Sequence, residues 1–406
     1  MFKKLVCTRF LYTVAMQMQA IILGWQMYVL THNPLYLGLI GLAEAIPALG
    51  LALFSGYIVD RNNPIIILRA MIGLGFISGL IIFISHAPFI HINTHYQILA
   101  LFLSAFLTGV ARSFLHPCIF VIMPRLIPRN QLAKASAWMT SSFQIASISG
   151  PALGGILFGW TGILFTAIIL CSLILSALIM TFLMQAPAPE RAQNTPRKSI
   201  RKELLSGAEF VFKHPILLPA LSLDMLSVLF GGVTALLPIY AAEILHIGPK
   251  GLGILSAAPA IGATVITLWL TKINMKHRAG SWLLSAVTGF GICILVFAVS
   301  KNVILSFIAL ALSGAFDGVS AVIRSTAIQL CSHDDMRGRI SAINMIFISS
   351  SNELGAFESG LAAKLIGPVP AAFFGGIACL FTVLAVTLLC PKLRKLDIEK
   401  LETATQ

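Results

Sequence analysis

Twelve long apolar stretches, separated by short polar segments, restrict the fold of this chain more than any other feature. Each stretch reaches the roughly 18–20 residues that a helix needs to cross a bilayer. The stretches are Phe10–Leu30, Leu39–Val59, Ile65–Ile84, Ile98–Met123, Ala135–Gly159, Ile163–Met184, Ile216–Tyr240, Leu252–Thr271, Trp282–Ser300, Val303–Cys331, Ile340–Leu365 and Ala371–Cys390. The sequence therefore predicts an all-α membrane protein with twelve transmembrane helices.

Composition and charge agree with a membrane protein. The chain is 57% hydrophobic and 11% charged, whereas about a quarter of a soluble domain is charged. Its net charge of +13 is spread over many loops, which argues against a nucleic-acid-binding surface. If the N-terminus is cytoplasmic, most Lys and Arg lie in inside loops, and only Lys250, Lys301 and Lys364 lie near the outside. This bias predicts a multi-pass membrane protein with both termini in the cytoplasm.

The N-terminus and the cysteines predict no processing or cross-linking. The apolar run after Lys3, Lys4 and Arg9 is too long for a signal peptide and predicts the first membrane helix. The seven cysteines are scattered and none lies in a predicted outside loop, so neither a disulfide framework nor a metal site is expected.

The longest polar segment divides the twelve stretches into six and six. It is rich in Pro and charge, which predicts a cytoplasmic linker over residues 185–214 that ends in a short amphipathic helix. We therefore expect a six-helix bundle over 1–184, a second over 215–391 and a cytoplasmic tail over 392–406.

An internal repeat relates the two halves. Gly41–Gly50 aligns with Gly253–Gly262 at an offset of 212, which brings Pro47 onto Pro259. Beyond a long outside loop, the offset is 205, and Gly150–Gly155 aligns with Gly355–Gly360. Parallel repeats of this kind predict two bundles related by a pseudo-two-fold axis.

Few charged side chains occur within the predicted spans, where each costs about 2.5–3.5 kcal/mol to insert. The offset of 205 places Arg112 on Asp317, so equivalent positions carry opposite charges. One interpretation is a structural salt bridge, either Arg112–Asp317 or Asp317–Arg324, because Asp317 and Arg324 are two helical turns apart. The other is a protonatable carboxylate, and Asp224, with no evident local partner, is the simplest proton carrier.

Two glycine-containing motifs predict helix contacts. Gly150 and Gly154 have the spacing of small residues that let helices approach closely, and Pro151 predicts a kink. Asp60 and Arg61, at the inner end of the second stretch, predict a latch to a neighbouring loop.

No enzyme site is predicted. The sequence has no phosphate-binding loop and no nucleophile–base set. His91 and His95 have a spacing that would suit a metal on a helix, but they lie in a predicted outside loop bounded by Pro, which argues against a metal site. We therefore expect neither catalysis nor a cofactor.

Several motifs together resemble the major facilitator superfamily. They are "GYIVDR" after the second stretch, "GVARSF" in the fourth and "GPALGG" in the fifth. The second-half blocks "DGVSAVIRSTAIQL" and "SNELGAFESG" look like a bacterial branch related to enterobactin exporters and macrolide-type efflux proteins. The resemblance implies proton-driven alternating access, with Arg112 at the arginine tied to proton transfer. It also implies that Gly150, Pro151, Gly154 and Gly155 form the antiporter motif, and Asp60 with Arg61 the inner gate motif.

The resulting expectation is proton-coupled efflux of a small amphipathic, drug-like or siderophore-like molecule across the bacterial inner membrane, by a monomer in contact with lipid. Proton-coupled import of a siderophore or another metabolite is the alternative, and a non-transporting scaffold is a further one. Candidate proton-coupling residues are Asp317, Asp224, Arg112, Glu353 and Glu358. Candidate substrate-binding residues are Gln19, Trp25, Tyr28, Arg112, Tyr240, Asp317 and Arg324.

Overall fold

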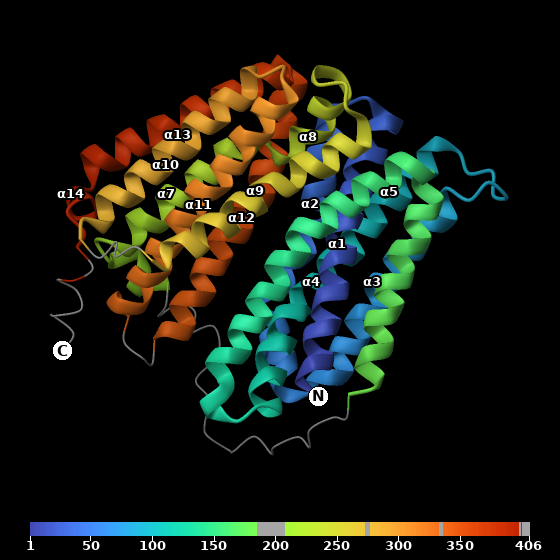
Figure 1. The fold of residues 1–406 in the computed structure, drawn as a ribbon, viewed down its shortest axis with the longest axis horizontal. Coiled ribbons are helices and arrows are strands. Elements are labelled where there is room, and N and C mark those ends of the chain that lie inside the picture. The colour runs from blue at the N-terminus through green and yellow to red at the C-terminus, as the bar shows by residue number, and fades with distance from the viewer. Residues whose placement is uncertain (185–207, 273–276, 333–335, 398, 400–406) are drawn as a thin grey trace. The chain divides into compact units, whose positions relative to one another are not determined.

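A computed structural model describes residues 1–184, 208–272, 277–332, 336–397 and 399 (Figure 1). These residues are helical with short connections, and no strand occurs among them. The helices are α1 (Phe2–Thr31), α2 (Pro34–Arg61), α3 (Pro64–Ser85), α4 (Thr94–Leu126), η1 (Arg129–Gln131), α5 (Leu132–Phe182), α7 (Leu217–Gly231), η2 (Val233–Leu236), α8 (Leu237–Ile239), η3 (Tyr240–Ile244), α9 (Gly248–Leu270), α10 (Ala279–Val299), α11 (Val303–Cys331), α12 (Arg337–Ile366), α13 (Pro368–Leu389) and α14 (Pro391–Arg394). The all-α prediction is confirmed.

Asparagine caps define where four of the long helices begin. The side chain of Asn33 accepts a hydrogen bond from the Leu35 backbone N–H (3.1 Å), and Pro34 occupies the first helical position of α2. Asn63 and Pro64 begin α3 in the same way, while Asn93 and Asn302 cap α4 and α11. Asn satisfies a backbone donor that has no partner inside the helix, and Pro lacks that donor, so both suit a helix start.

The predicted boundary between the fifth and sixth spans is observed inside α5, whereas the seventh predicted span is irregular. Gly162 adopts a positive φ of 74° inside α5 and separates the stretches predicted as the fifth and sixth spans. The predicted span Ile216–Tyr240 is not one regular helix, because α7 ends at Gly231 and gives way to η2, α8 and the π-helical η3. Gly231 and Gly232 are poor helix formers, and Pro238 lacks a backbone donor, which accounts for the irregularity.

Ten helical segments in the described part of the chain are long and apolar enough to cross a membrane. The 51-residue α5 counts once among them although it contains two predicted spans. Helix α12, which carries the predicted span Ile340–Leu365, is not among them. A multi-pass membrane protein is thus confirmed, while twelve spans in two six-helix bundles stay a prediction.

The chain divides by internal contacts into two units. Unit 1 comprises Met1–Gln193 and Leu237–Ala257, and unit 2 comprises Asn194–Leu236 and Ala258–Gln406. The segment Leu237–Ala257, from the second half of the sequence, therefore packs with the first half. The bundle boundaries expected from the sequence stay a prediction. Of the predicted linker, residues 208–213 are helical, with a Glu209–Lys213 ion pair, and 185–207 lie outside the described residues.

Residues that the sequence repeat aligns make equivalent contacts in the two units. In unit 1, a Cβ added to Gly109 would meet Pro47 and the Glu44 backbone. In unit 2, a Cβ added to Gly314 would meet Pro259, and Gly314 and Pro259 are the repeat partners of Gly109 and Pro47. Gly150 against Gln17 is likewise matched by Gly355 against Leu229. The two halves therefore use the same close helix contacts.

Candidate functional site

A buried ion pair joins Asp224 of α7 to Arg324 of α11 within unit 2. Both residues are nearly inaccessible, with 7% and 6% of their surface exposed. Asp224 has no local partner on its own helix, as expected, but it is not a lone carboxylate, because Arg324 of α11 compensates its charge. Its partner was missed because it lies on another helix, which the spacing along α7 cannot reveal. Arg324 pairs with Asp224 rather than with Asp317, its neighbour two turns away on α11.

Asp317 nevertheless lies beside this pair. Asp224 and Asp317 line one small cavity inside unit 2 together with Ser227, Ser320 and apolar side chains that include Phe290. The cavity measures about 10 Å³, which is the size of a single water molecule. The Ser227 and Ser320 hydroxyls are buried; Ser227 lies in hydrogen-bonding reach of the Cys379 thiol, and the Ser320 hydroxyl has no partner among the described residues. Sequence reasoning missed both serines, although Ser227 and Ser320 each follow a predicted aspartate by three residues.

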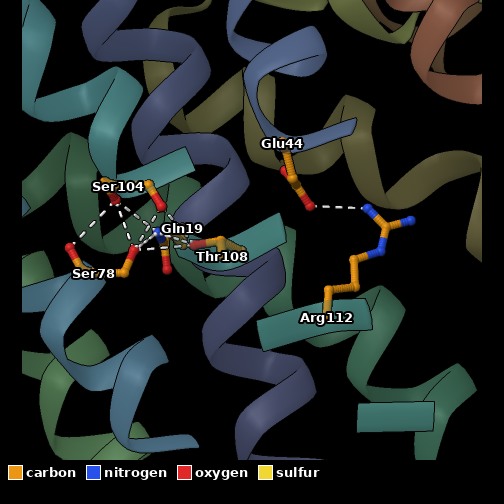
Figure 2. A network of polar contacts seen from close by, with 6 residues as sticks. All are labelled: Gln19, Glu44, Ser78, Ser104, Thr108 and Arg112. Carbon is orange, nitrogen blue, oxygen red and sulfur yellow. Dashed lines mark hydrogen bonds and ion pairs between the residues drawn. The ribbon is translucent and has the colours of Figure 1, made fainter. Parts of the chain in front are cut away.

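A polar network lies within unit 1 (Figure 2). The Gln19 amide of α1 donates to Ser78 Oγ at 2.7 Å, and Ser104 Oγ and Thr108 Oγ1 lie within 2.9 Å of the same nitrogen. Gln19 is fully buried, and the hydroxyls come from α3 and α4. The network therefore joins three helices, and the substrate-binding role predicted for Gln19 stays a prediction. The equivalent contact in the second half is apolar. Gly231, the repeat partner of Gln19, packs against Phe290, the repeat partner of Ser78.

Arg112 of α4 forms an ion pair with Glu44 of α2, with Nη1 and Oε1 2.9 Å apart (Figure 2). The Arg112 side chain is 52% exposed and that of Glu44 is 23% exposed, so this pair is far more open than the Asp224–Arg324 pair. Arg112 belongs to unit 1 and Asp317 to unit 2. The predicted Arg112–Asp317 pair stays a prediction.

The three predicted aromatic residues lie in unit 1. The Tyr28 hydroxyl of α1 donates to Glu243 Oε1 of η3, an acid that the sequence reasoning did not select. Tyr240 is fully buried, and Trp25 is partly exposed. Tyr28 and Glu243 thereby join α1 to the segment Leu237–Ala257, which accounts in part for that segment's place in unit 1.

The glycine motif of α5 packs as predicted against neighbouring backbones. A Cβ added to Gly150 would lie 2.5 Å from Gln17 Cβ, and one added to Gly154 would lie 3.0 Å from Met18 Cα, both on α1. On another side of α5, Gly155 faces Gly253 of α9. The kink predicted at Pro151 stays a prediction. The backbone of α5 leaves helical angles at Gly162, where the boundary between the fifth and sixth spans was predicted and where a Cβ would meet nothing within 4 Å.

The remaining candidates lie apart from the charged cluster and the Gln19 network. The Arg61 guanidinium lies 4.2 Å from the Tyr57 ring centroid on the same helix, and the Asp60 side chain lies outside the described residues. Glu353 and Glu358 are partly exposed on α12, and Ser359, beside Glu358, donates to the Gly232 carbonyl. A further acidic group, His277 with Asp397 and Glu399, lies outside the predicted site and has the donor types of a cation site.

Comparison with known proteins identifies the family. The family model described as "Major Facilitator Superfamily" matches residues 5–356 of this chain. The chain is 24% identical over 403 residues to the enterobactin exporters EntS of Citrobacter koseri and of Escherichia coli O1:K1 / APEC, covering 97% of this chain and 92% of each relative.

Solved structures agree on the fold. A POT family transporter in complex with 5-aminolevulinic acid has a TM-score of 0.74 at 13% identity, covering 97% of this chain and 96% of its own. A bacterial homologue of the human lysosomal transporter Spinster, in an inward-facing and unoccupied conformation, has a TM-score of 0.73 at 15% identity, with the same coverage. The helices, the repeated contacts and the match across most of the chain establish that this protein is a transporter, not an enzyme, and belongs to the Major Facilitator Superfamily.

Proposed function

We propose that this protein exports a small amphipathic organic molecule across the bacterial inner membrane in exchange for protons, by alternating access. Its relatives along 97% of the chain are named as exporters of enterobactin, which favours outward transport of a siderophore-like cargo. The distribution of Lys and Arg supports a cytoplasmic location of both termini.

The cluster of Asp224, Asp317 and Arg324 is the observation that carries the proton coupling. With both carboxylates ionised, the three side chains hold one net negative charge at the small cavity of unit 2, where Asp224 and Arg324 are buried and Asp317 is partly exposed. A buried charge without compensation is costly, whereas one added proton makes the cluster neutral. Because Arg324 already compensates Asp224, we assign the exchangeable proton to Asp317, whose neighbours in the cavity are uncharged apart from Asp224.

Protonation then biases the conformation. The neutral cluster is compatible with a dry interior, whereas loss of the proton favours a conformation in which water reaches Asp317. A ligand that binds two conformations with different affinity shifts the equilibrium between them, and the proton is such a ligand. Access from opposite sides of the membrane in the two conformations would couple proton entry to cargo exit.

Unit 1 offers a place for an acidic part of the cargo. The Arg112 guanidinium remains half-exposed while paired with Glu44, so a carboxylate or phenolate could share it. Arg112 is therefore proposed to contact cargo rather than to carry protons.

Flux in proteoliposomes tests this function. With enterobactin and ethidium as probes, an outward-directed proton gradient, with an acidic lumen, should drive accumulation in inside-out vesicles. Asp317→Asn, which mimics the protonated carboxyl, should still exchange probe for probe but should lose gradient-driven accumulation. Glu209→Gln is the matched control. It neutralises an exposed carboxylate that precedes α7 in the sequence, and it should behave as the unmodified protein. Accumulation in right-side-out vesicles that requires an inward-directed proton gradient would instead favour the import alternative.

A further inference from the structure

A second cavity, unrelated to the charged cluster, lies at one end of unit 1. It is formed by the first turns of α1, the turn between α4 and α5, and the first turns of α5. Its volume of about 760 Å³ is within the range of sites that bind organic ligands. The proposed function makes no use of this cavity.

The lining combines long apolar walls with two cations. Phe2, Phe10 and Trp138 provide aromatic surface, and Lys3 and Lys134 are both exposed at the cavity. No acidic residue lines it. The surrounding charge has the same sign, because residues 1–184 contain nine Lys and Arg but only two acids.

A buried polar group is directed at this cavity as well. Ser142 of α5 is 8% exposed and lines the cavity, yet its hydroxyl has no partner among the described residues. A buried hydroxyl without a hydrogen bond costs about 1–3 kcal/mol, so a bound acceptor oxygen would offset that cost. Phosphate ester oxygens are acceptors and carry the negative charge that Lys3 and Lys134 complement.

We propose that this cavity binds one anionic phospholipid, with the phosphate at Lys3 and Lys134 and the acyl chains against the aromatic walls. The cavity lies at the helix ends, where lysines from adjacent helices recognise anionic headgroups and where Trp is enriched at the membrane boundary. The apolar walls favour a lipid over a small soluble anion, because only an amphiphile covers both parts of the lining.

Lipid retention tests the proposal. The purified protein is equilibrated with an equimolar mixture of phosphatidylglycerol and phosphatidylcholine, and the bound lipids are counted by native mass spectrometry. We expect one retained phosphatidylglycerol and a preference that falls about fivefold for each lysine neutralised in Lys3→Gln and Lys134→Gln. The double variant Lys392→Gln/Lys395→Gln removes two exposed charges outside the cavity and should keep the preference.

A second measurement locates the lipid and separates it from other anions. Brominated phosphatidylglycerol should quench the fluorescence of Trp138, so that Trp138→Phe loses that part of the quenching. An unchanged preference in Lys3→Gln/Lys134→Gln would overturn the proposal. So would saturation of the cavity by inorganic phosphate, or by anilinonaphthalene sulfonate that phosphatidylglycerol does not displace, because the site would then take soluble anions.

Discussion

Asp224 of α7 and Arg324 of α11 face each other in the interior of unit 2. Each side chain compensates the charge of the other, which would be costly to bury without a partner. Removal of one partner from such a pair leaves an unpaired charge, which typically costs 3–5 kcal/mol, whereas removal of both leaves none. This asymmetry makes the pair measurable independently of transport.

We predict that Arg324→Gln lowers the free energy of unfolding by about 3–5 kcal/mol, while Asp224→Asn/Arg324→Gln together cost clearly less. Thermal unfolding in detergent micelles, read as a double-mutant cycle, measures the difference. The Arg112→Gln change at the half-exposed pair with Glu44 is the control and should cost below about 1 kcal/mol. Additive losses in the cycle at Asp224 and Arg324 would contradict a direct ion pair.

The Gln19 network yields a prediction for unit 1. Gln19→Leu keeps the volume of the side chain but removes the donor shared by Ser78, Ser104 and Thr108, so we expect a loss of about 1 kcal/mol in stability. The loss stays modest because Ser78 and Thr108 also donate to the Ser104 carbonyl. Gln26→Leu, the same change at a partly exposed position of α1, should be neutral or stabilising.

Much of the fold could be predicted from the sequence because the signals were local. Apolar runs gave the helices, and the offsets of 212 and 205 paired Pro47 with Pro259 and Gly150 with Gly355, whose contacts prove equivalent. The two halves differ at aligned positions whose residue types are not the same. Gln19 and Ser78 form a polar contact, whereas the equivalent Gly231 and Phe290 fill the same space without hydrogen bonds.

The candidate site was less predictable because its contacts join distant segments. Spacing along α11 suggested Asp317 as a partner of Arg324, but the choice of Asp224 depends on how α7 packs. Likewise, nothing in the sequence near Tyr28 indicates Glu243, since Leu237–Ala257 joins unit 1 only through tertiary packing.

Substitution by Ala should have opposite effects on stability at Gly155 of α5, which packs against Gly253 of α9, and at Gly73 of α3, which packs against nothing. An added Cβ at Gly155 would lie 2.5 Å from the Pro249 carbonyl oxygen and 2.6 Å from Gly253 Cα, so Gly155→Ala must separate the two backbones. We expect a loss of about 1–3 kcal/mol. Gly73→Ala on α3 meets nothing within 4 Å and should gain about 0.5–1 kcal/mol, because Ala is the better helix former. Equal thermal stability of the two variants would argue against close packing at Gly155.

His214 predicts a pH dependence at the start of α7. Its ring Nδ1 accepts hydrogen bonds from the backbone N–H groups of Ile216 and Leu217 at 3.3 and 3.2 Å, and only a neutral imidazole can do so. Burial lowers the pKa of His214 below its ordinary value of 6.5, so the unfolded chain binds this proton more readily than the folded chain. Stability contributed here is therefore present above about pH 6.5 and is lost as the pH falls below that value.

Unfolding temperatures between pH 5.5 and 7.5 measure this effect. His214→Gln should flatten the part of the profile below about pH 6.5 and lower stability at pH 7.5, because the cap is weakened at every pH. His214→Asn supplies a side-chain oxygen that can accept the same N–H groups without titrating, so it should flatten the profile while retaining stability at pH 7.5. If both variants kept the full acid-side decline, the decline would arise from other groups. Because α7 carries Asp224, the same cap also holds one wall of the charged cavity in place.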